Sequence, residues 1–348
     1  MEKIIRIGVD TSKSVFQLHG VDEAEKPVLR KRLTRDQLLT FFRKLGPTVV
    51  GMEACGGSHH WARRLQELGH EVRLMPPHLV KPYVPPGRKN DAADAEAICE
   101  AMSRPRMRFV KVKTVDQQAD LMLQNGRSLL IRQQTQLSNA IRANAAELGV
   151  VAAKGLSKVE GLLRRIAQDR TLPENARLSC EVLGEQLAEV DKRTEAIAAR
   201  LRAWHQKNEC SRRLATIPGI GQRTATALAM KVTDPHVFKS GRHFGSWVGL
   251  TPKDHSTAGK TRLGGITRAG DEELRSLLVV GATAVIQQVR KSRGRQWPWL
   301  VELVKRKPPK LAAVALANKM ARIAWKMMVS GESYRADYQS RPPVAEAA

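Results

Sequence analysis

Short apolar runs separated by turn residues dominate the first 110 residues of the chain. Three such runs in succession predict strands of an antiparallel meander, because only a few residues connect each run to the next. Beyond them helical and strand patterns alternate, and glycine ends both helices. In order, we expect strands at Ile4–Val9, Ser14–Val21 and Val28–Thr34, a helix at Asp36–Leu45, a strand at Thr48–Glu53, a helix at His59–Leu68 and a strand at Val72–Met75. This order predicts a mixed-sheet α/β domain over residues 1–110.

A proline-rich basic loop at Lys81–Lys89 leads into a further predicted helix, from about Asn90 to Ser103. Residues 112–207 then hold few glycines or prolines and favour helices throughout. Within them, apolar positions follow in alternating steps of three and four residues, which is the heptad seam of a coiled coil: Leu183, Leu187, Val190, Thr194, Ile197, Leu201 and Trp204. The seam needs a partner helix, and the sequence leaves open whether that helix belongs to the same chain or to a second subunit.

The last third of the chain predicts helices on both sides of a glycine-rich segment between Gly245 and Gly270. It opens with the turn Pro218-Gly219-Ile220-Gly221 between two helical patterns, which is similar to a helix-hairpin-helix. Further helices are expected at Glu272–Arg290 and Leu311–Val329, with a basic loop from Arg290 to Arg295 between them. We therefore predict an α/β domain over 1–110, a helical coiled-coil domain over 111–210, a mostly helical domain over 211–330 and a tail over 331–348.

An excess of basic side chains points to a polyanionic partner. The chain carries 59 Lys and Arg against 34 Asp and Glu, a formal net charge of +25. Residues 211–348 alone hold 24 basic and 9 acidic side chains, so we expect most phosphate contacts in this third. A basic surface that serves only solubility is the alternative.

The cysteines and the apolar runs exclude several other classes of protein. The four cysteines lie far apart without a C-x-x-C pair, which argues against a thiolate zinc site of ordinary spacing and fits reduced intracellular thiols. Charged residues follow the first Met too early for a signal peptide, and no apolar run is long enough to span a bilayer. We expect a cytoplasmic protein, associated with the nucleoid when it binds DNA, with no membrane partner.

Four acidic residues are the most informative candidates for chemistry. Asp10 and Glu53 each end an apolar strand, and Asp91 and Asp94 stand three residues apart on one face of a predicted helix. Such carboxylates can hold hard divalent ions, Mg²⁺ or Mn²⁺, which favour oxygen ligands and serve phosphoryl transfer. Taken singly, the strand-end acids would be ordinary turn residues, and the helix pair would be an N-terminal cap and an acidic first turn.

Glycines, hydroxyls and cations gather in two loops of the last third. Backbone N–H groups at the Gly219–Gly221 turn can bind phosphate without reading bases, although a plain turn would need the same glycines. In GLTPKDHSTAGKTRLGGI, Ser256 and Thr257 lie near cations, where a hydroxyl can bind phosphate or attack it; an ordinary loop hydroxyl is the alternative. The AGKT within this segment lacks the spacing of a nucleotide-binding P-loop. The candidate nucleic-acid contacts are Gly219, Gly221, Arg223, Lys253, Lys260, Arg262 and Arg268.

Six short motifs, in order along the chain, carry a resemblance to a known family. They are Gly8-Val-Asp-Thr-Ser-Lys13, Met52-Glu-Ala-Cys-Gly56, Lys89-Asn-Asp-Ala-Ala-Asp-Ala95, Ile217-Pro-Gly-Ile-Gly221, Trp247-Val-Gly-Leu-Thr-Pro252 and Leu263-Gly-Gly-Ile-Thr-Arg-Ala-Gly270. With them, residues 4 to about 330 resemble the DEDD-type insertion-sequence transposases, which are also described as bridge-RNA-guided serine recombinases.

The resemblance implies an N-terminal domain similar to the RuvC resolvase, with an RNase H-like fold, whose four acids correspond to Asp10, Glu53, Asp91 and Asp94. It implies a C-terminal transposase domain with a serine nucleophile, which best matches Ser256, with Thr257 beside it as the alternative. It also implies a coiled-coil linker, a homo-oligomer (a dimer or tetramer), and a structured noncoding RNA that pairs with donor and target DNA. Recognition by RNA would leave the protein to hold nucleic-acid backbones and shape.

Together, the residues and the resemblance predict a DNA transposase that cuts and rejoins DNA through a phosphoserine intermediate, with carboxylate-bound Mg²⁺ and a guide RNA. One alternative is a RuvC-like metal-dependent nuclease, in which water replaces the serine and no adduct forms. The other is a non-catalytic nucleic-acid-binding scaffold. A covalent protein–DNA adduct separates the recombinase from the nuclease, and binding of a divalent ion separates both enzymes from the scaffold.

Overall fold

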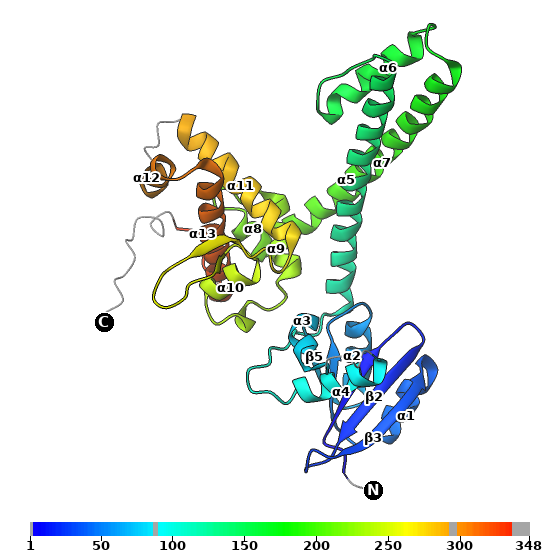
Figure 1. Cartoon of the computed structure of the whole chain (residues 1–348), viewed down its shortest axis with the longest axis vertical. Coiled ribbons are helices and arrows are strands. Elements are labelled where there is room, and N and C mark those ends of the chain that lie inside the picture. The colour runs from blue at the N-terminus through cyan, green and yellow to red at the C-terminus, as the bar shows by residue number, and fades with distance from the viewer. Residues whose placement is uncertain (1–2, 86–89, 292–297, 336–348) are drawn as a thin grey trace. The chain divides into compact units, whose positions relative to one another are not determined.

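The computed structural model describes residues 3–85, 90–291 and 298–335 (Figure 1). The chain divides into two compact units, Met1–Gln118 and Ala119–Ala348. The finer division at residues 110 and 210 stays a prediction. Parts of the two expected basic loops, and the tail beyond residue 335, lie outside the described residues.

A five-stranded mixed sheet forms the centre of the first unit, with the strand order β3-β2-β1-β4-β5. The first three strands are antiparallel neighbours, and β4 and β5 run parallel to β1. The strands are β1 (Arg6–Thr11), β2 (Val15–Val21), β3 (Pro27–Thr34), β4 (Val49–Glu53) and β5 (Glu71–Met75). The predicted meander and mixed sheet are therefore confirmed.

Helices cover both faces of this sheet. The apolar sides of α1 (Arg35–Lys44) and α2 (Ser58–Glu67) share one core with strand residues such as Val9 and Met52. The opposite face is covered by α4 (Asp91–Ala101), which packs across β1 and β2. The short helices α3 (Pro77–Val80) and η1 (Lys81–Tyr83) precede α4 in the chain. Alternation along each strand thus sends one set of side chains toward α1 and α2 and the other toward α4.

Gly8 allows α4 to lie directly on β1. A Cβ atom at Gly8 would lie 2.2 Å from the Ala95 carbonyl oxygen and 2.5 Å from the Cys99 backbone nitrogen, both in α4. Gly51, its partner in β4, leaves room in the same way for Met102 at the end of α4. Any larger residue at Gly8 would therefore push the helix off the sheet.

We expect Gly8→Ala to lower the free energy of unfolding by about 3 kcal/mol or more, because the helix backbone has no room to yield locally. Urea unfolding measures the change. Gly46→Ala is the matched control, since a Cβ there meets nothing within 4 Å and should cost less than about 0.5 kcal/mol. Equal stability of the two variants would contradict this close packing.

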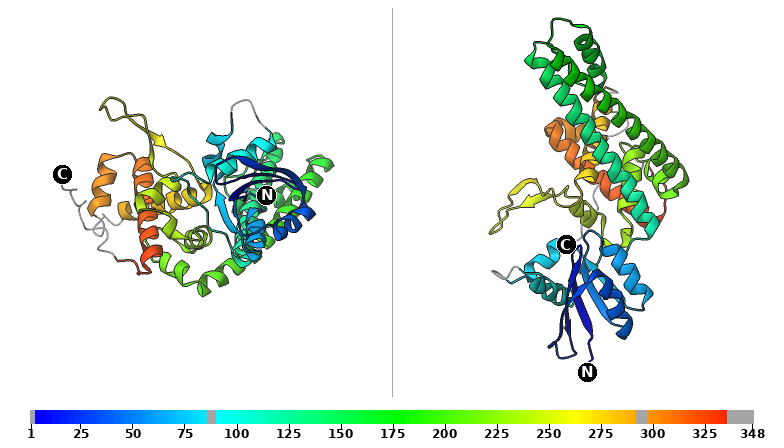
Figure 2. Two further views of the ribbon diagram at one scale, coloured as in Figure 1. Left: turned by 90° about the horizontal axis from the view of Figure 1, so that it is seen from below. Right: turned by 90° about the vertical axis from the view of Figure 1, so that its right-hand side faces the viewer.

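Two long helices open the second unit. The predicted seam of α7 (Glu174–Lys207) lies along α5 (Val115–Glu147), as both Figure 1 and Figure 2 show. Seam residues Leu187, Val190 and Leu201 are buried in α7. Polar contacts also join the two helices: Gln134 Nε2 donates to Asp191 Oδ1 at 2.6 Å, and Trp204 Nε1 donates to Asp120 Oδ2 at 2.7 Å. At their far end, η2 (Leu156–Lys158) and α6 (Val159–Gln168) complete a small core. The seam therefore has a partner helix within its own chain.

The rest of the second unit packs short helices around one apolar core. The predicted helices at the start and end of this region are found, as is the turn between α8 and α9. The sequence analysis assigned no element to the glycine-rich segment between Gly245 and Gly270, which contains the β6–β7 hairpin, and it also missed α10 and α12. The elements are α8 (Glu209–Leu214), α9 (Gln222–Lys231), η3 (Pro235–Val237), α10 (Gly241–Trp247), β6 (Pro252–Asp254), β7 (Leu263–Ile266), α11 (Glu272–Lys291), α12 (Pro298–Arg306) and α13 (Pro309–Ser330).

Candidate active site

The register of two parallel strands brings Asp10 and Glu53 to the same edge of the sheet. Val9 of β1 pairs with Met52 of β4, so the next residue on each strand is an acid. Gly8 and Gly51, two residues earlier, both face α4, and side chains two apart on a strand share a face. Both carboxylates therefore lie on the α4 side of the sheet.

The first turn of α4 supplies the other two acids. Asn90 caps the helix, since its side-chain oxygen accepts a hydrogen bond from the Ala93 backbone nitrogen at 2.8 Å. Asp91 is therefore not the cap, as one alternative had it, and its carboxylate is not needed to satisfy the helix end. Asp91 and Asp94 both lie in the acidic first turn.

Three of the four acids lie close together. Asp10, Asp91 and Asp94 each offer a carboxylate oxygen, and these three oxygens all lie within 4.8 Å of one another. Asp91 is exposed and the other two are half-buried. Glu53 is outside this group of three, but the strand register places it on the same face, at the strand end beside Asp10. The fold thus gathers four acids that are distant in the sequence.

The crowded, half-buried environment disfavours the charged forms of Asp10 and Glu53. Burial, followed by the charges of Asp94 and Asp91, raises the pKa of Asp10 to about 6. Burial is also the main reason why the pKa of Glu53 is raised. A divalent cation among them would offset this repulsion, and carboxylate oxygens are the donors that Mg²⁺ and Mn²⁺ favour. The donor set therefore fits a hard divalent cation.

Ser256 lies in the loop of the β6–β7 hairpin in the second unit. Its backbone nitrogen donates to Asp254 Oδ1 at 2.8 Å, and its Oγ accepts a hydrogen bond from the Arg262 backbone nitrogen at 3.0 Å. Hydrogen bonds from the side chain and the backbone of Ser256 also hold the pKa of Asp254 below its ordinary value. Ser256 and Thr257 are both exposed, so each hydroxyl is open to a large substrate.

Two family models match the parts of the chain that hold these residues. A model of the DEDD transposases of IS110, described as "Transposase", matches residues 7–148. A model described as "Transposase IS116/IS110/IS902 family" matches residues 211–297. A putative transposase from Sinorhizobium fredii is 61% identical over 336 residues, which cover 96% of this chain and 87% of that protein. This chain belongs to the IS116/IS110/IS902 family of transposases.

Other transposases are similar over nearly the whole chain. A probable family 20 transposase from Pseudomonas aeruginosa is 43% identical over 333 residues, 95% of this chain and 98% of that protein. The transposase for insertion sequence element IS1111A from Coxiella burnetii is 38% identical over 338 residues, 96% of this chain and 92% of that protein. The resemblance to insertion-sequence transposases is therefore confirmed, as is the class of fold, a RuvC-like mixed sheet followed by helices. DNA is the substrate of such a transposase.

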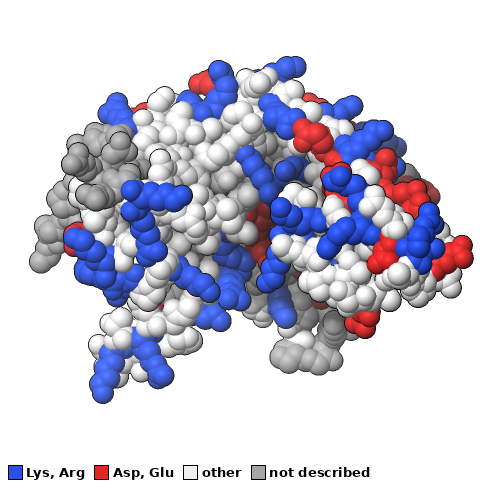
Figure 3. Space-filling view, turned by 90° about the horizontal axis from the view of Figure 1, so that it is seen from above, with Lys and Arg blue, Asp and Glu red and all other residues white. Residues whose placement is uncertain are grey.

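The other candidate contacts of this transposase lie in the second unit. Lys253, Lys260, Arg262 and Arg268 are exposed, and none of them makes an ion pair with the described residues. Figure 3 shows that many Lys and Arg side chains on the visible face extend into solvent. Gly221 is the N-cap residue of α9 and leaves that helix end without a side-chain cap, while Gly219 adopts a left-handed backbone with φ 86°. Their contacts with nucleic acid stay predictions.

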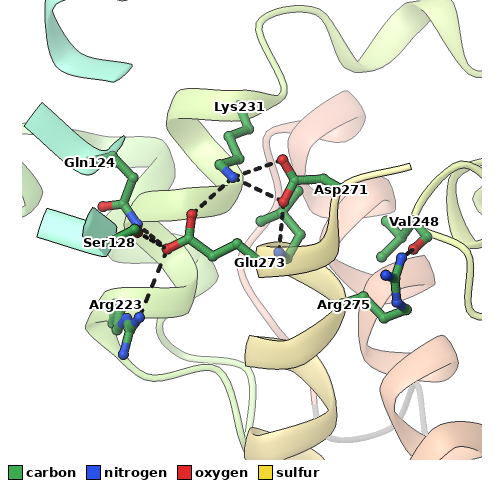
Figure 4. A network of polar contacts seen from close by, with 9 residues as sticks. Gln124, Ser128, Arg223, Lys231, Val248, Asp271, Glu273 and Arg275 are labelled. Atoms are coloured by element: carbon green, nitrogen blue, oxygen red, sulfur yellow. Dashed lines mark hydrogen bonds and ion pairs between the residues drawn. The ribbon is translucent and has the colours of Figure 1, made fainter. Parts of the chain in front are cut away.

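Arg223 takes part in a partly buried ionic network that sequence patterns did not indicate (Figure 4). Glu273 lies at its centre: it accepts hydrogen bonds from Gln124 and Ser128 of α5, each at 2.8 Å, and pairs with Lys231 at 2.9 Å. Lys231 also pairs with Asp271 at 2.7 Å, whereas Arg223 is 3.8 Å from Glu273. Burial alone would raise the pKa of Glu273, but the hydrogen bonds from Lys231, Ser128 and Gln124 hold it below its ordinary value. The network thus anchors α5 to α9 and α11.

The raised pKa of Asp10 predicts that this transposase binds divalent ions less tightly in mild acid. With a pKa of about 6, the side chain is mostly a carboxylate above that pH and mostly protonated below it. Because only the carboxylate binds a cation, Mg²⁺ affinity should fall about tenfold between about pH 7.5 and about pH 5, as measured by isothermal titration calorimetry.

The raised pKa of Asp10 also determines how the folding stability of the protein changes with pH. Because the folded-state pKa of Asp10 is raised, the group stabilises the ion-free protein only in acid, and that contribution is lost as the pH rises through about 6. Added Mg²⁺ should therefore raise the unfolding temperature more above this pH than below it. An affinity that does not vary over this range would mean that Asp10 is not a ligand.

Among the described residues, no helix is both long and apolar enough to cross a membrane.

Proposed function

We propose that this transposase cuts and rejoins DNA through a covalent phosphoserine link at Ser256, with Mg²⁺ or Mn²⁺ held by Asp10, Glu53, Asp91 and Asp94. A structured noncoding RNA pairs with donor and target DNA and selects the sites. The working enzyme is a homo-oligomer, a dimer or tetramer. The observation that carries the proposal is the cluster of Asp10, Asp91 and Asp94, with Glu53 at the neighbouring strand end, because carboxylate oxygens are the ligands that hard divalent ions favour.

The carboxylates hold the ion and exclude softer metals by their oxygen donors. When bound, the ion supplies positive charge that offsets the charge developing on the phosphate oxygens in the transition state. Asp91, which is exposed, and half-buried Asp10 and Asp94 present that charge at the surface, where a DNA backbone has access. Placement of the acids on a rigid sheet and helix keeps this arrangement fixed during the reaction.

Ser256 carries the covalent step. Its Oγ attacks phosphorus and forms a new P–O bond, the bond from phosphorus to one strand oxygen breaks, and that oxygen takes up a proton while the serine proton passes to solvent. The phosphoserine link is itself a phosphodiester and conserves the free energy of the broken bond. A strand hydroxyl can therefore attack it later, rejoin the DNA and restore Ser256. The hydrogen bond from the Arg262 backbone nitrogen to Oγ orients the hydroxyl before the attack.

The acids lie in the first unit and Ser256 in the second. A catalytic centre that combines them can draw on two subunits, which is why we include an oligomer in the proposal. The excess of positive charge over residues 211–348 supports contacts with the backbones of DNA and RNA, which do not depend on base sequence.

Incubation of the full chain with its guide RNA and DNA in Mg²⁺, followed by a denaturing gel, tests the proposal. A protein-linked DNA band is expected. Cleaved DNA without that band would favour the hydrolytic nuclease. DNA binding with neither cleavage nor a saturable ion isotherm would favour the non-catalytic scaffold.

A further inference from the structure

A groove of about 430 Å³ lies beside the carboxylates, on the α4 face of the sheet. Its walls are the outer strands β2 and β3 on one side and the first turns of α4 on the other. Asn90, Ala92 and Ala93 of α4 line it, and the acids Asp91 and Asp94 belong to the same turn. The groove and the carboxylate site therefore share one wall.

The strand register connects the groove to Asp10. Asp10 of β1 pairs with Gln17 of β2, which pairs with Arg32 of β3. Directly paired residues share a face, so this row runs from the carboxylate site into the groove. Two strand spacings amount to roughly 10 Å, which is about three base-pair steps along the axis of a DNA duplex. Arg32 thus lies within a few nucleotides of Asp10.

The charges of the groove favour an anion. Arg30 and Arg32 both line it and are exposed, and neither makes an ion pair with any residue in the described ranges. His19, which pairs with Arg30 in the sheet, also lines the groove, and burial lowers its pKa. Glu96 of α4 is the acid among the lining residues. Lys31 also lines the groove, but its Nζ lies over the Phe41 ring. The groove thus offers the guanidinium groups of Arg30 and Arg32 to a ligand, with one opposing carboxylate.

We propose that this groove binds the phosphodiester backbone of the DNA strand that is cut, a few nucleotides from the scissile phosphate. The inference rests on the proposed function, because it assumes that DNA reaches the carboxylates. Four acids repel a DNA backbone, and a strand brought beside them needs cations next to them to hold it. Arg30 and Arg32 provide bidentate phosphate donors at that position.

Charge variants of the full chain provide the first test. Arg30→Gln combined with Arg32→Gln should weaken binding of a fluorescently labelled DNA strand about tenfold at about 0.1 M salt, and should lower the salt slope by roughly 1.5. Glu96→Gln should act in the opposite direction and strengthen binding about threefold. Arg43→Gln with Lys44→Gln is the matched control, because these exposed residues of α1 carry the same charge on the opposite face.

A local measurement complements the affinities. A photoreactive phenylalanine analogue in place of exposed Ala92 should cross-link to DNA, and the same analogue in place of Arg43 should not. Equal losses for the groove pair and the control pair would overturn the proposal, as would equal cross-linking at both positions. Cross-linking of the Ala92 position to RNA of the same sequence but not to DNA would overturn the choice of DNA.

The test separates this inference from the proposed function. The groove variants should retain the Mg²⁺ isotherm of the unchanged protein, which shows that the carboxylate site is intact. If the unchanged protein fails to cut DNA in Mg²⁺ while the Ala92 position still cross-links to DNA, the proposed function fails and the groove stands only as a DNA-binding site. If the groove variants cut DNA with full activity and the Ala92 position does not cross-link to DNA, the groove assignment alone fails.

Discussion

Ser256→Ala is expected to abolish the denaturant-resistant protein–DNA adduct and all strand rejoining, while binding of the guide RNA is unchanged. Removal of Oγ removes the only atom of this side chain that can attack phosphorus. The loop should keep its shape, because the Asp254 carboxylate accepts from the backbone nitrogen of residue 256, which alanine retains. A denaturing gel with end-labelled DNA measures the adduct.

Thr257→Ala is the matched control for that variant. It removes the neighbouring exposed hydroxyl, and we expect the adduct to form at an unchanged rate. An adduct that persists in Ser256→Ala but is lost in Thr257→Ala would transfer the nucleophile to Thr257. An adduct that survives both changes would remove the hairpin hydroxyls from the mechanism.

Asp10→Asn is expected to reduce divalent-ion-dependent DNA cleavage about 1000-fold or more, because the change removes the half-buried carboxylate that lies against both acids of α4 and that we propose as an ion ligand. The ion affinity should fall with it, as measured by calorimetry. The ion-free variant should also unfold at a higher temperature than the unchanged protein, because a neutral amide avoids both the burial of a charge and the repulsion from Asp94 and Asp91 that raise the pKa of Asp10. A higher unfolding temperature would show that the variant is folded, so that its loss of cleavage comes from the carboxylate site.

Asp36→Asn provides the control for the charge change. Asp36 is an exposed acid in the first turn of α1, on the opposite side of the sheet from the carboxylates. Its replacement should leave cleavage and ion affinity as they were. Full cleavage activity in Asp10→Asn would remove the carboxylate cluster from the mechanism.

Local patterns predicted the first unit well because its strands and helices are bounded by strong signals. Glycine and proline end α1 and α2, and alternation within β1 and β2 separates the face toward α1 and α2 from the face toward α4. From the sequence, the strand-end acid Asp10 and the helix acids Asp91 and Asp94 could form one site or could be ordinary turn and cap residues, and the pattern did not decide between the two. Their convergence depends on Gly8, whose missing side chain lets α4 approach, and no local pattern encodes that contact.

The second unit was harder to predict because its short elements depend on distant partners. The glycine-rich stretch gave no period long enough to indicate α10, and β6 has only three residues, paired across a loop. The Lys231–Glu273 ion pair joins residues 42 apart in the numbering, and Gln124 approaches from still further away. Such contacts exist only once the helices have packed.

The hairpin that carries Ser256 is self-contained. Both contacts that orient the residue, from Asp254 and from the Arg262 backbone, belong to the same stretch of some ten residues. A rigid-body movement of the β6–β7 hairpin would therefore keep the orientation of the Ser256 hydroxyl relative to the hairpin. If the whole segment were exchanged between related transposases, the hydrogen bonds that orient Ser256 would be transferred with it. An exchange with its boundary between Asp254 and Arg262 would separate the two contacts.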